Sequence, residues 1–222
     1  MRKIVANLFV SLDSVVEAPE EWTFPYFNDE VGQAVGEGFA ASDALLMGRV
    51  NYEDWAAVWP GRDGPLADTI YSIRKYVVTT TLQTASWTNS SIVSGDVAAE
   101  ITSLKEQPGK DIAMSGSATL AEWLLHAGLL DELRLLVYPI VVGTGKRLFA
   151  DGQPRIGMEL VGSKTYQTGV VDLTYRPAER PGGFRTVILW FLCCFLLLDP
   201  FAFGFVRCAV ADGGMEPDLV VA

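Results

Sequence analysis

The amino-acid sequence predicts an α/β domain with a mostly parallel central sheet, helices on both of its faces and a C-terminal antiparallel hairpin. Short apolar segments of strand length alternate along the chain with longer segments of helical periodicity. Glycine or proline separates many of these segments. The last two strand-like segments are joined by the short connection Gln167-Thr168-Gly169, which is typical of a hairpin and adds antiparallel edge strands.

The strands are predicted from short runs rich in β-branched, aromatic and other apolar residues. The first run contains mainly Ile, Val, Leu and Phe and is followed at once by the polar residues 11–14. We interpret the next stretch, 17–27, which contains Trp22, Phe24, Tyr26 and Phe27, as irregular. Strands are expected at 3–10, 44–47, 76–80, 91–93, 112–114, 132–138, 158–166 and 170–175.

The helices are predicted where apolar residues recur at helical spacing between residues that usually begin or end a helix. Helices are expected at 29–41, 50–59, 67–73, 97–106 and 118–126. Their expected caps and breakers are Asn28 or Asp29, Pro60-Gly61, Asp96, Pro108-Gly109, Ser115-Gly116-Ser117 and Gly128.

Composition and charge exclude several classes of function. The chain of 222 residues carries 17 Lys and Arg against 27 Asp and Glu, a net charge of −10. Because so acidic a surface repels phosphate backbones, we expect no nucleic-acid partner. The single histidine, His126, excludes a metal site made of several histidines, and at the end of an apolar helix we expect it to be structural.

The three cysteines, Cys193, Cys194 and Cys208, all lie beyond residue 190. Residues 1–190 therefore hold no disulfide and no thiolate metal site, and we predict no bound metal. The first apolar segment is too short for a secretory signal, since Asp13 follows it closely. We therefore expect a cytoplasmic protein.

Two strand-to-helix junctions carry residues suited to binding phosphate. Glycine lets a ligand approach the backbone, and a helix N-terminus offers unpaired N–H groups and a partial positive charge. Two such junctions at the carboxyl ends of strands in one sheet would bracket a dinucleotide, although each alone also fits an ordinary turn. The residues concerned are Gly48, Arg49 and Asn51 in the first junction and Gly116, Ser117, Ala118 and Thr119 in the second.

Polar residues at two other strand ends have alternative interpretations. Asp13 follows the first strand near aromatic residues, where a carboxylate would have a raised pKa and handle protons. A plain turn-forming aspartate fits that spacing equally well. Thr79 and Thr80 end the third strand, where their hydroxyls would bond a phosphate or ribose, or would only favour strand structure.

Two glycine-containing segments are not nucleotide fingerprints. Residues 36–41 match the pattern GxGxxA, but they fall within a helical segment rather than after a strand. The loop 139–149 contains Gly145-Lys146 but lacks the first glycine and the following Ser or Thr of a P-loop. This loop either approaches the cofactor or substrate or simply connects two strands.

Five short segments stand in a characteristic order along the chain. They are FVSLD at 9–13, LMGRVNYE at 46–53, VVTT at 77–80, SGSATL at 115–120 and the loop at 139–149. In this order they resemble the dihydrofolate-reductase-like reductases, most closely the C-terminal reductase domain of the bifunctional riboflavin-synthesis deaminase-reductase. The resemblance covers residues 1–177 and implies a dihydrofolate-reductase-like fold for a reductase domain at 1–178.

The resemblance implies an NADPH-dependent oxidoreductase that transfers hydride to a small heterocyclic or ribosylamino substrate, similar to dihydrofolate reductase or to 5-amino-6-(5-phosphoribosylamino)uracil reductase. NADPH would lie across the sheet, with its 2′-phosphate and adenosine near Arg49, Thr79 and Thr80. Its pyrophosphate would sit on the helix starts at Asn51 and at 116–119. Asp13 would face the nicotinamide and orient or protonate the substrate. A homodimer is also implied, because family members often form dimers.

Two residues depart from the family pattern. Ser14 stands where the family usually has glycine, and Asn51 stands where threonine is common. The sequence has no zinc-deaminase signature, HxE with PCxxC, so we do not expect the bifunctional enzyme. The departures leave open an alternative, a catalytically inactive NADPH-binding dimeric protein.

The composition changes sharply after residue 178. Residues 186–206 contain a single charge, Asp199, and as a helix would extend about 31 Å, which is enough to span a bilayer core. Preceding arginines would then keep the domain cytoplasmic. Asp199 and Pro200 are costly in lipid, so for residues 179–222 we favour an artefactual or poorly ordered tail over a membrane anchor.

Overall fold

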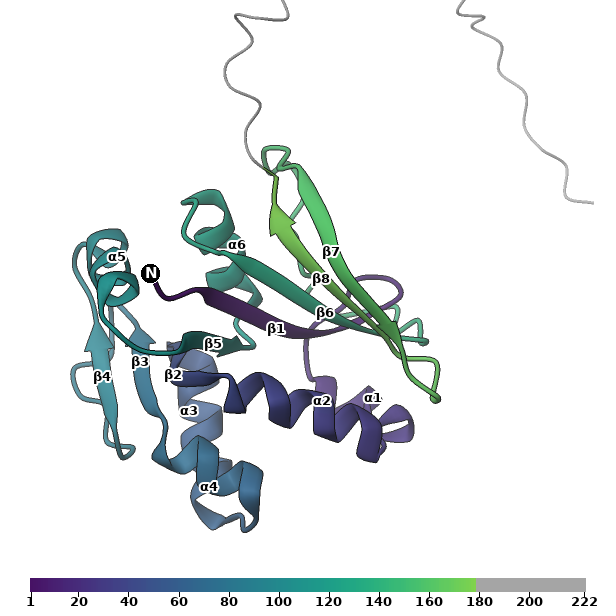
Figure 1. Cartoon of the computed structure of the whole chain (residues 1–222), viewed down its shortest axis with the longest axis horizontal. Helices are drawn as coiled ribbons and strands as arrows, with labels where there is room; N and C mark the ends of the chain where they lie inside the picture. Colours follow the sequence, from purple (N-terminus) through teal and green to yellow (C-terminus); the bar gives the residue numbers. More distant parts are fainter. Residues whose placement is uncertain (179–222) are drawn as a thin grey trace, which may run out of the picture. The chain divides into compact units, whose positions relative to one another are not determined.

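The computed structural model describes residues 1–178, through which one eight-stranded sheet runs (Figure 1). All the strands predicted from the sequence are present, most with ends displaced by one or two residues. The strands are β1 (Ile4–Ser11), β2 (Ser42–Gly48), β3 (Arg74–Val78), β4 (Ser90–Val93), β5 (Asp111–Ser115), β6 (Glu132–Tyr138), β7 (Met158–Thr165) and β8 (Val171–Pro177).

The sheet has the order β4-β3-β2-β5-β1-β6-β8-β7. Strands β1 to β6 are parallel to one another, whereas β8 is antiparallel to β6 and β7 is antiparallel to β8. The predicted mostly parallel sheet with a C-terminal antiparallel hairpin is thus confirmed. Because the six parallel strands all point the same way, the segments that follow them gather at one edge of the sheet.

Helices connect the parallel strands as expected, except that β3 and β4 are joined by the non-helical residues 79–89. The interval 17–27 differs from the prediction, because it contains a short helix and a 3-10 turn rather than irregular chain. Pro19 is the first residue of the helix and Pro25 the second residue of the 3-10 turn, positions where the fixed φ of proline favours helical geometry. The elements are α1 (Pro19–Trp22), η1 (Phe24–Tyr26), α2 (Asp29–Ala40), α3 (Arg49–Val58), η2 (Trp59–Gly61), α4 (Pro65–Ser72), α5 (Val97–Glu106) and α6 (Ala118–His126).

The core lies on both faces of the sheet because alternate side chains of a strand point to opposite sides. In β2, Leu46 joins a buried cluster with residues of α5 and α6, such as Ile101 and Leu124. Its neighbours Leu45 and Met47 join a second cluster with residues of α2, α3 and α4. These two clusters confirm the prediction that helices cover both faces.

The end of β3 corrects one predicted boundary. The strand stops at Val78, so Thr79 and Thr80 lie beyond it rather than at its last positions. The Thr79 hydroxyl oxygen accepts hydrogen bonds from the backbone N–H groups of Thr81 (3.2 Å) and Leu82 (3.0 Å). This local bonding turns the chain away from the sheet.

Within residues 1–178, no helix is both long enough and apolar enough to cross a membrane. The hydrophobic run 186–206 and the three cysteines lie outside the described residues.

Candidate functional site

The two predicted phosphate junctions lie side by side at the carboxyl edge of the sheet. Strands β2 and β5 are parallel neighbours, and Leu45 pairs with Ala113. Gly48 is three residues beyond Leu45 and Gly116 is three residues beyond Ala113, so the two glycines lie at the same level of the sheet edge. A Cβ atom on Gly48 would lie 2.6 Å from the Oγ of Ser117. The openings of α3 and α6, by which we mean the N-terminal ends of these helices, can therefore lie this close together only because residue 48 is glycine.

The openings of α3 and α6 leave their first backbone N–H groups free of side-chain caps. The N-cap residues are Gly48 and Ser117, and neither makes a side-chain capping bond. By contrast, Asn28 caps α2 by accepting from the Val31 N–H at 3.0 Å, and Asp96 caps α5 in the same way. Uncapped N–H groups and the helix dipole make the openings of α3 and α6 suited to an anion.

Asn51 connects the two openings directly. Its side-chain amide, in the first turn of α3, donates a 2.8 Å hydrogen bond to the carbonyl oxygen of Ser115 at the end of β5. A Cβ atom on Gly116 would lie 2.9 Å from the Asn51 Oδ1, and Gly116 also has a φ of +80°. Glycine at 116 and asparagine at 51 are therefore matched residues. The departure from the family's threonine has a structural role here.

Two non-glycine residues of this edge have a left-handed backbone conformation. Ser117 has a φ of +59°, and Ser14, where the family usually has glycine, has a φ of +68°. Such left-handed conformations cost an ordinary residue about 1–2 kcal/mol. Strain of this kind is typical of functional segments.

Arg49, Thr79 and Thr80 lie on the β3 side of the openings. Gly48 pairs with Val78, so Arg49 and Thr79 begin at the same level of the edge. Arg49 is exposed and its guanidinium donates to Glu53 at 2.7 Å, one helical turn away. Thr79 is buried and its oxygen already accepts two backbone N–H groups, whereas Thr80 is exposed. Thr79 therefore shapes the turn that presents Thr80.

Asp13 lies on the other side, beyond the end of β1. Its carboxylate accepts hydrogen bonds from the backbone N–H groups of Val142 (3.0 Å) and Gly143 (2.8 Å) and from the Ser11 hydroxyl (2.7 Å). These donors, the Ser11 hydroxyl first, lower the pKa of Asp13 to about 2. The expectation of a raised pKa is thus wrong, because donors rather than burial dominate. Asp13 is ionised at neutral pH and has no proton to donate.

The loop 139–149 lies against the chain that follows β1. The N–H of Leu12 donates to Ile140 at 2.8 Å, and the N–H of Val16 donates to Lys146 at 2.9 Å. At its far end the loop reaches α6, where the Lys146 ammonium donates to the Thr119 hydroxyl. The loop therefore runs past both the Asp13 end and the α6 end of the site. Lys146 was not among the site residues predicted from sequence, since only the folded loop brings it there.

Aromatic side chains fill the core beside Asp13. Tyr138, at the end of β6, pairs with Ser11 and is surrounded by the rings of Phe9, Trp22 and Tyr26 at centroid distances of 5.5–6.2 Å. Burial raises the pKa of the Tyr138 hydroxyl. Among residues 1–178 this hydroxyl has no hydrogen-bond partner. Sequence reasoning noted the aromatic residues but did not identify Tyr138.

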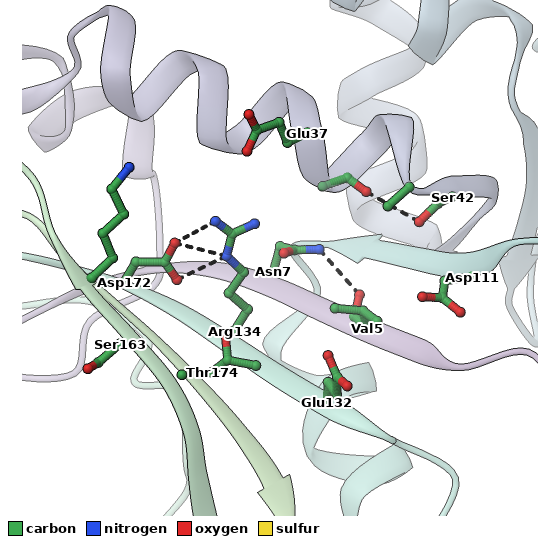
Figure 2. Close-up of a pocket in the computed structure, with 14 residues that line it drawn as sticks. Val5, Asn7, Glu37, Ser42, Asp111, Glu132, Arg134, Ser163, Asp172 and Thr174 are labelled. Carbon is green, nitrogen blue, oxygen red and sulfur yellow. Dashed lines mark hydrogen bonds and ion pairs between the residues drawn. The ribbon is translucent and has the colours of Figure 1, made fainter.

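A separate polar cavity of about 380 Å³ lies between the C-terminal half of α2 and the sheet (Figure 2). Figure 2 shows Arg134 paired with Asp172. The hydrogen bonds between the two side chains are 2.5–3.0 Å long, and the Tyr166 hydroxyl also donates to Asp172 at 2.8 Å. Arg134 further donates to the Ala34 carbonyl at 3.2 Å, which ties α2 to β6 and β8. None of the predicted site residues lines this cavity.

Comparison with known proteins supports the fold and indicates a family. The model of the RibD C-terminal domain matches residues 2–171. The uncharacterized protein YyaP of Bacillus subtilis (strain 168) is 32% identical over 186 residues, which cover 78% of this chain and 94% of that protein.

Two solved structures illustrate the fold. A putative riboflavin biosynthesis protein from Shewanella sp. PV-4 has a TM-score of 0.67 at 19% identity, covering 80% of this chain and 99% of its own. Dihydrofolate reductase from Enterococcus faecalis, complexed with NADP(H), has a TM-score of 0.55 at 14% identity, covering 80% and 97%. The predicted dihydrofolate-reductase-like fold is confirmed.

Proposed function

This chain belongs to the RibD C-terminal domain family, and on that premise we propose that it is an NADPH-dependent oxidoreductase acting on a small heterocyclic or ribosylamino substrate. The membership indicates a reductase domain, whereas the cofactor and the substrate are the finer parts of the proposal. One observation carries it: two uncapped helix openings stand level at one sheet edge, and their glycines clear the space between them.

The residues present fit a dinucleotide. The free N–H groups at Asn51 and at Ala118 and Thr119 would hold a pyrophosphate, with Gly48, Gly116 and Ser117 forming the floor. Arg49, with Thr80 on the turn shaped by Thr79, would meet the adenosine end and its 2′-phosphate. When bound, NADPH supplies the hydride, and the chain supplies binding and orientation.

Asp13 would act on the substrate side as an ionised acceptor. Its lowered pKa supports orientation of a substrate N–H or O–H by the carboxylate and not protonation by it. The same carboxylate holds the backbone of Val142 and Gly143, so substrate contact and loop position would depend on one group. The proton that a reduced substrate gains would then come from solvent.

Titration of the full chain with NADPH, followed by the fluorescence of the cofactor, tests the proposal. We expect binding in the micromolar range and about tenfold weaker binding for Arg49→Ala, as for loss of one charge-assisted contact of about 1.5 kcal/mol. Arg155→Ala is the matched control, because Arg155 is exposed and remote in sequence from both junctions. Failure of the unmodified protein to bind at high micromolar NADPH would end the proposal.

The hydrogen bonds of Asp13 favour one alternative, an NADPH-binding protein without turnover. Both carboxylate oxygens already accept backbone N–H groups, which leaves less capacity for a substrate. NADPH consumption across a panel of pterin, pyrimidine and carbonyl substrates separates the two functions. Binding with no consumption on any of them would favour the inactive protein.

We further propose a homodimer in the cytoplasm that binds neither nucleic acid nor metal. The acidic net charge of −10 supports the exclusion of nucleic acid. Among residues 1–178, no group of three or more His, Cys, Asp or Glu side chains is arranged to hold a metal ion. Sedimentation of the full chain measures the oligomeric state directly.

A further inference from the structure

We propose that Lys146 is a further cofactor-binding residue, whose ammonium group pairs with the diphosphate at the opening of α6. The inference rests on the proposed function, because it requires NADPH at that opening. It assigns a cofactor contact to the loop 139–149, whose Val142 and Gly143 N–H groups already hold the Asp13 carboxylate.

The position of the ammonium group is the first argument. Lys146 Nζ donates to the hydroxyl of Thr119, which is an exposed residue in the first turn of α6. The N-cap of this helix, Ser117, makes no side-chain capping bond. A cation and the free N–H groups of a helix start therefore border the same space, and both attract an anion.

The absence of a competing anion is the second argument. Among residues 1–178, no carboxylate forms an ion pair with Lys146, whose ammonium is bonded to a neutral hydroxyl. Arg49, the other cation at the openings, is paired with Glu53 at 2.7 Å. Lys146 can thus pair with a phosphate without first breaking a salt bridge.

The backbone that carries Lys146 is held in place. Its N–H donates to the Glu17 carboxylate at 2.9 Å, and its carbonyl accepts from the Val16 N–H at 2.9 Å. The preceding Gly145 has a φ of +116°, and a Cβ atom there would lie 2.9 Å from Val15. Only glycine therefore lets the loop lie this close to the chain after β1, and this contact directs the lysine toward α6.

The negative net charge of the molecule makes a local cation such as the Lys146 ammonium group important for binding an anionic cofactor. A protein with a net charge of −10 repels an anionic dinucleotide at long range, so binding depends on local cations. The charged neighbours are Glu17, Glu122 and Arg147. Glu17 and Glu122 both accept backbone N–H groups, from Lys146 and Ala150. Arg147 is exposed and forms no side-chain ion pair among the described residues.

The test compares Lys146→Met with Arg147→Met, a matched change of one positive charge at the next residue of the loop. NADPH binding is measured by cofactor fluorescence at low and high salt. We expect Lys146→Met to weaken binding about tenfold and Arg147→Met by less than about twofold. Binding by Lys146→Met should also depend less on salt, because one ion pair has been removed. Lys146→Arg should restore most of the affinity.

Thermal melting without NADPH separates binding from folding. Lys146 is exposed, so the melting temperature of Lys146→Met should match that of the unmodified protein. Equal NADPH affinities for the two methionine variants would overturn the inference while leaving the proposed function intact. The inference would also be overturned if Lys146→Met melted at a lower temperature and both methionine variants lost NADPH affinity to the same extent. No NADPH binding by the unmodified protein would refute the proposed function itself.

Discussion

Gly48→Ala tests whether the openings of α3 and α6 truly share one space. Gly48 has a φ of −80° and a ψ of 160°, which alanine adopts without strain. The effect of the change is therefore steric. The new methyl group would lie 2.6 Å from Ser117 Oγ and 3.2 Å from Ser117 Cβ. Rotation of the Ser117 hydroxyl relieves the first contact but not the second, so the start of α6 must move away from the end of β2.

Forcing an extra carbon into a packed site costs about 1–3 kcal/mol. For a domain of this size, each kcal/mol lowers the melting temperature by roughly 2–4 °C. The separation of the openings should also weaken NADPH binding about tenfold, because a misplaced donor loses most of a charge-assisted hydrogen bond of about 1.5–3 kcal/mol.

The assay combines thermal melting with NADPH titration, and Gly36→Ala is the matched control. Gly36 lies within α2, and a Cβ atom there would meet nothing within 4 Å. Alanine in a helix interior should stabilise the protein by about 0.5–1 kcal/mol and leave NADPH binding unchanged. If Gly48→Ala melted and bound NADPH as the unmodified protein does, the close contact between the openings would be refuted.

Two other perturbations have definite signs. Burial lowers the pKa of Lys75 to about 8, and when the protein unfolds this group returns toward 10.5. Between pH 8 and 10.5 Lys75 is protonated in the unfolded chain but largely neutral in the folded protein. The free energy of unfolding should therefore rise with pH over this range, by at most about 3 kcal/mol. Below pH 8 Lys75 is protonated in both states and should contribute no pH dependence. Urea unfolding of the unmodified protein and of Lys75→Met isolates this contribution. If the free energy of unfolding changed with pH to the same extent in both proteins, the prediction would be contradicted. Ser14→Gly should stabilise the protein by up to about 1 kcal/mol, because release of the strain at a φ of +68° exceeds the entropy cost of glycine. Ser14→Ala keeps the strain and serves as the control in the same unfolding measurement, and a less stable Ser14→Gly would show that the serine is not strained.

Helix and strand positions with strong local signals were predictable from the sequence. The predicted bounds of α6 and β6, 118–126 and 132–138, agree with the structure. Ser-Gly-Ser before α6 and Gly128 after it explain this agreement, since breakers act on the residues next to them. The predicted bounds differed from the structure where contacts with residues distant in sequence determine the ends of an element. Strand β2 extends over Ser42–Gly48 rather than 44–47, because β5 and β3 offer backbone partners on both sides.

The chemistry of the site divides in the same way. Glycine and short polar residues at two strand ends indicate phosphate binding wherever they lie in space, so Gly48 and Gly116 could be singled out from the sequence alone. The pKa of Asp13 could not be predicted from the sequence, since two of the three groups that donate hydrogen bonds to it, Val142 and Gly143, are about 130 residues away. Aromatic neighbours in sequence suggested burial, but contact with the loop after β6 decides the charge state.

The sequence by itself determined the alternation of strands and helices, the two glycine junctions and the family, because periodicity and turn residues are local properties of the chain. Only the tertiary structure decided that the junctions meet, since their contact depends on β2 and β5 being neighbours although they are separated along the chain by two other strands. The same holds for Lys146, which reaches α6 because Gly145 lets the loop pack against the chain after β1. Such placements follow from sheet order and close packing, which no short stretch of sequence encodes.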